Sequence, residues 1–115
     1  MAVQKVNILG EEWTLDVCPK EKYEKLGDDC DGFCDDSVRL MVVCDYSSKK
    51  PSPDWKSDLS REWKKTIRHE MVHSFMYESG LTGSGSAWAQ NEEMVDWVAY
   101  QLPKMVEAMK SVGAL

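Results

Sequence analysis

A chain of 115 residues with 43% hydrophobic and 30% charged residues has the composition of one folded domain, so we predict a single domain over residues 1–115 and exclude intrinsic disorder. The net charge of −6 argues against nucleic acid or an anionic membrane surface as the main partner. No apolar run reaches about 18 residues, the length at which a bilayer-spanning helix is predicted.

The N-terminal residues bear on the compartment. Residues 1–7 lack the apolar stretch of a secretory signal peptide, so we expect a cytoplasmic protein. In that compartment the four cysteines are expected to be reduced thiols. Cys30 and Cys34 fit no zinc-ribbon spacing, and neither a second metal site nor a disulfide is favoured there.

The first third of the chain alternates apolar and polar residues, which is typical of strands. Val6 and Ile8 have polar neighbours, and residues 13–17 alternate in the same way. A hairpin is predicted, with its turn at residues 9–11. Pro19 ends the second strand, because proline cannot donate a hydrogen bond to a sheet ladder.

A second strand region follows a polar stretch. Residues 20–32 are expected to be irregular, and strands are predicted at residues 33–34 and 38–45. The second of these strands is apolar at almost every position on both faces, so we expect it to be central or covered. Residues 47–54 contain two prolines and are predicted to link the strands to a helical half.

The first long helix is predicted to begin near Ser57 or Asp58, either of which can cap it, and to end at Gly80. Its apolar residues recur at helical spacing and form one stripe that is expected to pack on the sheet: Trp63, Ile67, Met71 and Phe75. Both histidines of the chain lie on this helix and point away from the centre of the stripe. We therefore expect them in a cleft rather than in the core.

A second helix is predicted after the glycine-containing loop at residues 81–90. Asn91 can cap this helix, and its first turn is acidic, as the helix dipole favours. Pro103 is expected to kink the helix, or to break it into a second segment that ends near Ser111. The predicted fold is thus α+β, with a small antiparallel sheet in the N-terminal half packed against two helices.

Both histidines belong to one pentapeptide, His69-Glu70-Met71-Val72-His73, which is the H-E-x-x-H pattern of zinc hydrolases. Imidazoles at positions i and i+4 lie one helical turn apart on one face and can bind a single Zn²⁺. We predict His69 and His73 as metal ligands, Glu70 as the general base, and one Zn²⁺ per chain. The alternative is an exposed charged helix face that carries two histidines by chance.

A hydrolytic zinc site needs three protein ligands and one open position for water. No further histidine exists in the chain, so the third ligand must be a carboxylate or a cysteine. The best candidate segment runs from Asn91 to Asp96, because it carries two glutamates on the second predicted helix.

Together, H-E-x-x-H at residues 69–73 and N-E-x-x-x-D at residues 91–96 resemble the gluzincin, or thermolysin-like, arrangement of zinc metallopeptidases. The string over residues 69–81, with residues 91–97, also resembles small zincin-like proteins of phage and prophage origin. More distantly, it is similar to the ImmA/IrrE-type metallopeptidases that act on repressors. The resemblance covers residues 69–103, about a third of the chain.

The resemblance implies roles for the second motif. Glu92 would be the third zinc ligand, and Asp96 would hydrogen-bond the distal nitrogen of one zinc-binding histidine, either His69 or His73. Glu93 fits the spacing nearly as well as a ligand. We prefer Glu92, because it lies one turn from Asp96 on the same side of the helix.

These residues predict a zinc-dependent metallopeptidase that acts on a peptide or protein substrate. Glu70 would take a proton from the attacking water and pass it to the leaving nitrogen. The substrate would add as a strand at the sheet edge, near Phe33 or residues 38–45. Tyr77 and Tyr100 have the chemistry to stabilise the oxyanion. The alternative is a zinc-stabilised interaction module without catalysis, such as a phage protein that binds a host factor.

Overall fold

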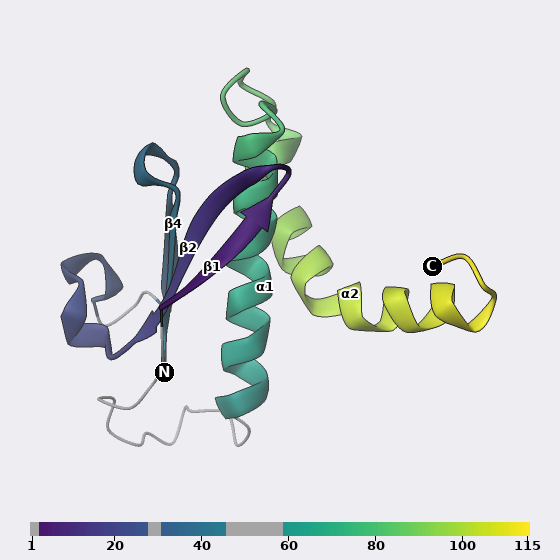
Figure 1. The fold of residues 1–115 in the computed structure, drawn as a ribbon, viewed down its shortest axis with the longest axis horizontal. Coiled ribbons are helices and arrows are strands. Elements are labelled where there is room, and N and C mark those ends of the chain that lie inside the picture. Colours follow the sequence, from purple (N-terminus) through teal and green to yellow (C-terminus); the bar gives the residue numbers. More distant parts are fainter. Residues whose placement is uncertain (1–2, 28–30, 46–58) are drawn as a thin grey trace.

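The computed structural model describes residues 3–27, 31–45 and 59–115. The main elements, in chain order, are β1 (Val3–Ile8), β2 (Glu11–Cys18), β3 (Gly32–Asp35), β4 (Leu40–Cys44), α1 (Leu59–Glu78) and α2 (Glu92–Ser111) (Figure 1). The predicted α+β class is confirmed. The predicted caps Ser57 and Asp58, the linker at residues 47–54 and Cys30 lie outside the described residues.

The predicted hairpin is confirmed. β1 and β2 pair antiparallel, with Ile8 opposite Glu11, so the connecting loop has only two residues. Both loop residues have positive φ, 50° at Leu9 and 94° at Gly10. That combination is the type I′ turn that matches the twist of a hairpin, and glycine adopts it without steric cost.

The sheet has the order β1-β2-β4-β3, and it is mixed rather than wholly antiparallel. β3 and β4 form a tight antiparallel pair, but β4 enters the sheet next to β2 and runs parallel to it. The expectation of an antiparallel sheet is therefore wrong for this pairing, which depends on the path of the chain between β2 and β3. β4 lies inside the sheet, as its apolar sequence predicts, and β3 is one of the two edge strands.

The core lies between the sheet and α1. One face of the sheet carries six buried residues against α1: Ile8, Trp13, Leu15, Val17, Met41 and Val43. The opposite face is covered at Val42 by a second cluster that includes the fully buried Leu26. Leu26 belongs to one of two short 3₁₀ helices, Lys20–Lys22 and Glu24–Leu26, so the stretch expected to be irregular is partly ordered and contributes to the core.

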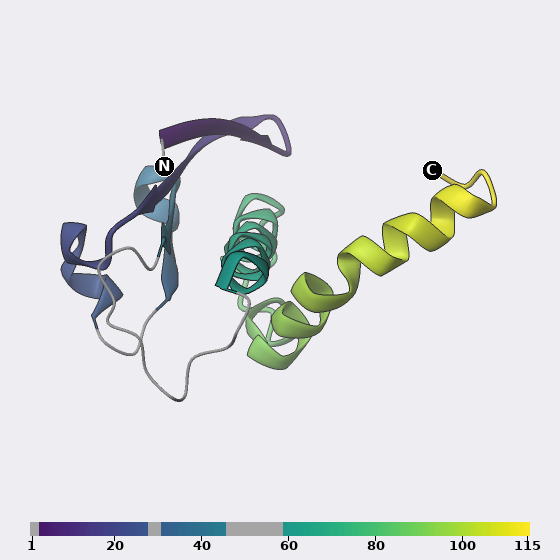
Figure 2. The same cartoon turned by 90° about the horizontal axis from the view of Figure 1, so that it is seen from below.

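α1 lies between the sheet and the first half of α2, as Figure 2 shows with α1 seen end-on. The expected apolar stripe is only partly correct, because Phe75 is 36% exposed whereas Ser74 is fully buried. Val72, on another side of the helix, is also buried at 7% exposure. Because the sheet covers one side of α1 and α2 covers another, the buried residues of α1 do not form a single stripe. The remaining side of α1 faces the opening between the sheet and α2.

α2 begins at the predicted cap, where the Asn91 side chain accepts a hydrogen bond from the Met94 N–H at 2.8 Å. The helix includes Pro103 without a break and changes direction near its middle (Figure 1). Of the two expected outcomes, the kink is therefore observed. The second half of α2 extends away from the remainder of the protein (Figure 2). Among the described residues, no helix is both long and apolar enough to cross a membrane.

Candidate metal centre

The two histidines of α1 lie on its open side, one turn apart. The ring centroids of His69 and His73 are 4.9 Å apart, and the side chains retain 19% and 17% of their exposure. Burial lowers the pKa of His73 below its usual range, an effect that the nearby Glu92 carboxylate opposes. Burial therefore favours the neutral imidazole, which is the form that binds a metal.

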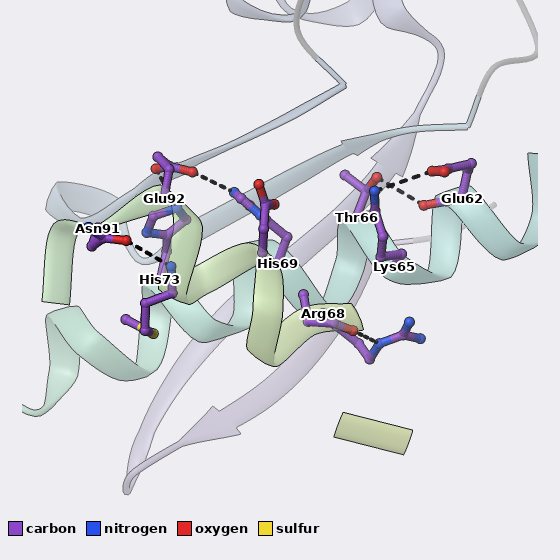
Figure 3. Close-up of polar contacts among 11 residues, drawn as sticks. Glu62, Lys65, Thr66, Arg68, His69, His73, Asn91 and Glu92 are labelled. Carbon is purple, nitrogen blue, oxygen red and sulfur yellow. Dashed lines mark hydrogen bonds and ion pairs between the residues drawn. The ribbon is translucent and has the colours of Figure 1, made fainter. Parts of the chain in front are cut away.

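Glu92, from the first turn of α2, completes a cluster with both histidines (Figure 3). Its Oε2 lies 3.1 Å from Nε2 of His69, and its Oε1 lies 3.0 Å from Nε2 of His73. The donor atoms of the three residues all lie within 4.8 Å of one another, and the group can hold a metal ion. Glu93 makes none of these contacts, so the structure brings Glu92 and not Glu93 to the histidines.

The distances between the donors are close to those between neighbouring ligands of one bound ion. Nitrogen and oxygen ligands lie about 2.0–2.1 Å from zinc, which places neighbouring tetrahedral ligands about 3.3 Å apart. The two carboxylate-to-imidazole distances are 3.0 and 3.1 Å. The Glu92 side chain is 65% exposed, so its carboxylate is accessible from solvent.

Asp96 lies one turn after Glu92 and contacts the opposite edge of one imidazole. Its Oδ1 is 2.8 Å from Nδ1 of His69. A carboxylate at Nδ1 holds the proton there and leaves Nε2 free to accept a metal. The motif alone left open whether Asp96 partners His69 or His73, and the structure pairs it with His69.

Glu70 lies beneath the histidines on the side that faces the sheet. It is 5% exposed, and burial, with a smaller contribution from Glu92, raises its pKa from 4.5 to about 8. A carboxyl with so high a pKa takes up a proton readily near neutral pH. This is the property that a general base requires, because proton transfer is most efficient when the pKa lies close to the working pH.

Gly32, the first residue of β3, allows the sheet to approach Glu70 closely. A Cβ at this position would lie 2.8 Å from the Val42 carbonyl oxygen and 3.1 Å from Oε2 of Glu70. No larger residue fits without a shift of backbone. Gly32 is not among the predicted site residues, and its only signal in the sequence is a glycine directly before the strand predicted at residues 33–34.

The cluster formed by His69, His73 and Glu92 opens into a cavity of about 300 Å³ between α1, the start of α2 and the edge strand β3. Phe33 and Cys34 line the β3 side, and Tyr77 lines the cavity one turn after His73. Tyr100 is not among the lining residues. Of the two tyrosines that the sequence offered as oxyanion donors, only Tyr77 is therefore at this site.

The described cysteines are free thiols. Burial raises the pKa of Cys34 to about 12 and that of Cys18 to about 11, which keeps both protonated near neutral pH. Cys44 is a buried thiol that also forms no disulfide with a described cysteine. Within the described residues, no cysteine belongs to a group of side chains placed to hold a metal ion. These thiols therefore act as small apolar side chains.

Comparison of the chain with protein-family models, curated proteins and solved structures found no match. The similarity to gluzincins consequently remains a prediction from the two motifs. What the chain can do chemically rests on the geometry of His69, Glu70, His73, Glu92 and Asp96.

Proposed function

We propose that the protein is a cytoplasmic zinc-dependent metallopeptidase that hydrolyses a peptide bond in a peptide or protein substrate. The observation that carries this proposal is the convergence of two imidazole Nε2 atoms and the Glu92 carboxylate at a cavity that the buried Glu70 also lines. A chance histidine pair on an exposed helix would have neither a shared carboxylate from a second helix nor a buried acid beside it.

Zinc is the metal that this donor set favours. Two neutral imidazoles and one carboxylate leave a fourth tetrahedral position open, which is the composition of catalytic zinc sites. When bound, zinc lowers the pKa of a water molecule and polarises a carbonyl oxygen. Asp96 orients the His69 ring for binding through its contact at Nδ1.

Glu70 is assigned the proton transfers. It is placed one residue after His69 on α1 and lines the same cavity as both histidines. Its carboxylate takes a proton from the attacking water and then gives the proton to the nitrogen of the broken amide bond. The high pKa of Glu70 supports both steps, because its carboxyl can take up and release a proton near neutral pH.

The edge strand β3 is assigned the binding of the substrate backbone. Among the described strands, β3 has β4 as its single neighbour, so its other edge lies beside no described strand. An extended peptide can add to such an edge and lie across the cavity in front of Glu70. Tyr77, at the same cavity, is assigned the stabilisation of the oxyanion.

A zinc-stabilised interaction module is the second candidate, and one observation favours it. The cluster joins α1 to α2, so a bound metal would fix the position of a helix whose second half extends away from the remainder of the protein (Figure 2). Such a metal would stabilise a binding surface without any reaction.

Hydrolysis of an unfolded protein separates the two candidates. The zinc-loaded wild type and the Glu70→Gln variant are incubated with fluorescently labelled, denatured casein, and zinc is measured by mass spectrometry. We expect about one zinc per chain in both proteins and cleavage by the wild type alone, with at least a 100-fold loss in the variant. Zinc retention without cleavage of any substrate would favour the interaction module, and loss of zinc in both would exclude both functions.

A further inference from the structure

A second cavity of about 550 Å³ lies between α1 and α2, and we call it the basic cleft. Among the described residues, four cationic side chains and one acidic side chain line it: Arg61, Lys65 and Arg68 from α1, Lys104 from α2, and Glu62. This local excess of positive charge stands in a chain whose net charge is −6. Like charges held together repel one another, so the cleft attracts an anionic ligand.

In the basic cleft, the positive charges of Arg68 and Lys104 are the ones that we regard as available to a ligand. Lys65 pairs with Glu62 at 3.4 Å. Arg68 donates from Nε to the Ala99 carbonyl oxygen at 2.6 Å, which fixes the guanidinium and leaves its terminal nitrogens for a ligand. In the part of the chain that the structure describes, no carboxylate pairs with Arg68 or with Lys104.

The basic cleft lies one helical turn from the metal centre on both helices. On α1, Lys65 precedes His69 by four residues, and on α2, Tyr100 of the cleft follows Asp96 by four residues. Four residues of helix advance about 6 Å. Figure 3 shows Lys65 and Arg68 beside His69 along α1. An extended chain advances about 3.3 Å per residue, so a peptide at the metal centre reaches the cleft within a few residues.

We propose that the basic cleft binds a cluster of acidic side chains in the polypeptide that reaches the metal centre. The identity of that polypeptide as a substrate rests on the proposed function, whereas the binding of carboxylates does not. Lysine and arginine side chains bind carboxylates well, and the guanidinium of Arg68 can do so with two hydrogen bonds. A short acidic segment suits the cleft better than a long polyanion, which the net negative charge of the protein repels.

Peptide binding tests this proposal directly. The probe is a fluorescein-labelled peptide with four consecutive glutamates in a glycine-serine sequence, and its control has glutamines at those four positions. Binding is measured by fluorescence anisotropy with the zinc-loaded Glu70→Gln protein, which does not consume the probe. We expect the glutamate peptide to bind in low salt, to bind several-fold more weakly in about 0.3 M salt, and to bind far better than the glutamine peptide.

Two double variants locate the binding. Lys65→Gln with Lys104→Gln removes two charges from the cleft and is expected to weaken binding about tenfold. Lys64→Gln with Lys110→Gln removes two charges from exposed positions of the same helices outside the cleft, and is expected to change binding less than twofold. Circular dichroism and thermal melting check that both variants fold like the parent protein.

Three results would overturn the proposal: no difference between the glutamate and glutamine peptides, equal weakening by both double variants, or tighter binding of inorganic pyrophosphate that displaces the peptide.

The proposed hydrolysis can fail separately. If the acidic peptide binds in a cleft-dependent manner while the wild type cleaves nothing, the cleft stands and the peptidase function does not. If the wild type cleaves acidic and neutral peptides with the same KM, the peptidase function stands and the cleft has no role in it.

Discussion

The metal centre and the basic cleft lie one helical turn apart between α1 and α2, yet they differ in how closely their side chains contact one another. The donors of the metal centre are carried on short side chains with partners at 2.8–3.1 Å, and Glu70 is buried against the sheet. The cleft is lined by long side chains, and those of Arg61 and Lys104 are exposed. Hydrolysis of one bond requires catalytic side chains that are held in fixed positions. Binding of a charged ligand tolerates movement of the side chains that carry the opposite charge. Substitutions at the metal centre should therefore have the larger effects.

The largest effect is expected for the third ligand. Structural zinc sites in zinc-finger peptides bind with about 10–16 kcal/mol in total, and by that scale loss of one of three protein ligands should weaken zinc affinity about 1000-fold. We expect this result for Glu92→Ala in a competition titration with a chelator. Glu93→Ala is the matched control, with less than a twofold change. A larger loss for Glu93→Ala than for Glu92→Ala would contradict the observed cluster.

Tyr77→Phe is expected to lower kcat about 100-fold on a casein substrate, because it removes a donor to the oxyanion. Zinc content should be unchanged, since Tyr77 is not among the donors of the metal cluster. An unchanged kcat in the zinc-loaded variant would show that Tyr77 serves only to pack against the core.

Asp96→Asn is expected to weaken zinc affinity about 10–100-fold, because the neutral amide orients and polarises His69 less well than a carboxylate. Glu107→Gln removes one negative charge from an exposed position of the same helix and is the control. If the two variants lose the same affinity, Asp96 acts through overall charge and not through its contact with His69.

Gly32→Ala tests the close approach of β3 to Glu70. The added Cβ would lie 2.8 Å from the Val42 carbonyl oxygen. We therefore expect the free energy of unfolding, measured by urea titration, to fall by about 1–3 kcal/mol. At Gly83, the nearest atom to an added Cβ is 3.9 Å away, and Gly83→Ala should change stability by less than about 0.5 kcal/mol. Equal effects of the two substitutions would mean that the close approach at Gly32 does not constrain the protein.

The buried Glu70 predicts a pH dependence of stability in the metal-free protein. Its folded-state pKa, about 8, lies above the ordinary value of 4.5, so the folded state holds a proton that the unfolded state loses between these values. The contribution of Glu70 to stability is therefore fully present below about pH 4.5 and falls by about 1.4 kcal/mol per pH unit as the pH rises towards 8. Urea titrations of Glu70→Gln should lack this slope, and the same slope in both proteins would assign it to another group.

Local patterns determined much of this protein from the sequence. The hairpin, the central position of β4, the Asn91 cap and the end of α1 before Gly80 follow from alternation, apolar content and helix-end chemistry. The positions of His69, Glu70 and His73 relative to one another were also predictable, because helix geometry alone places residues i and i+4 on one face.

Contacts between distant segments were decided only by the tertiary structure. The parallel pairing of β2 with β4 depends on the path of the chain between them, and the selection of Glu92 over Glu93 depends on how α2 packs on α1. The partnership of Asp96 with His69, the closeness of Gly32 to Glu70 and the basic cleft have the same origin. Sequence spacing fixes which face of an element a residue occupies, whereas the distance between two faces is set by packing of the whole core.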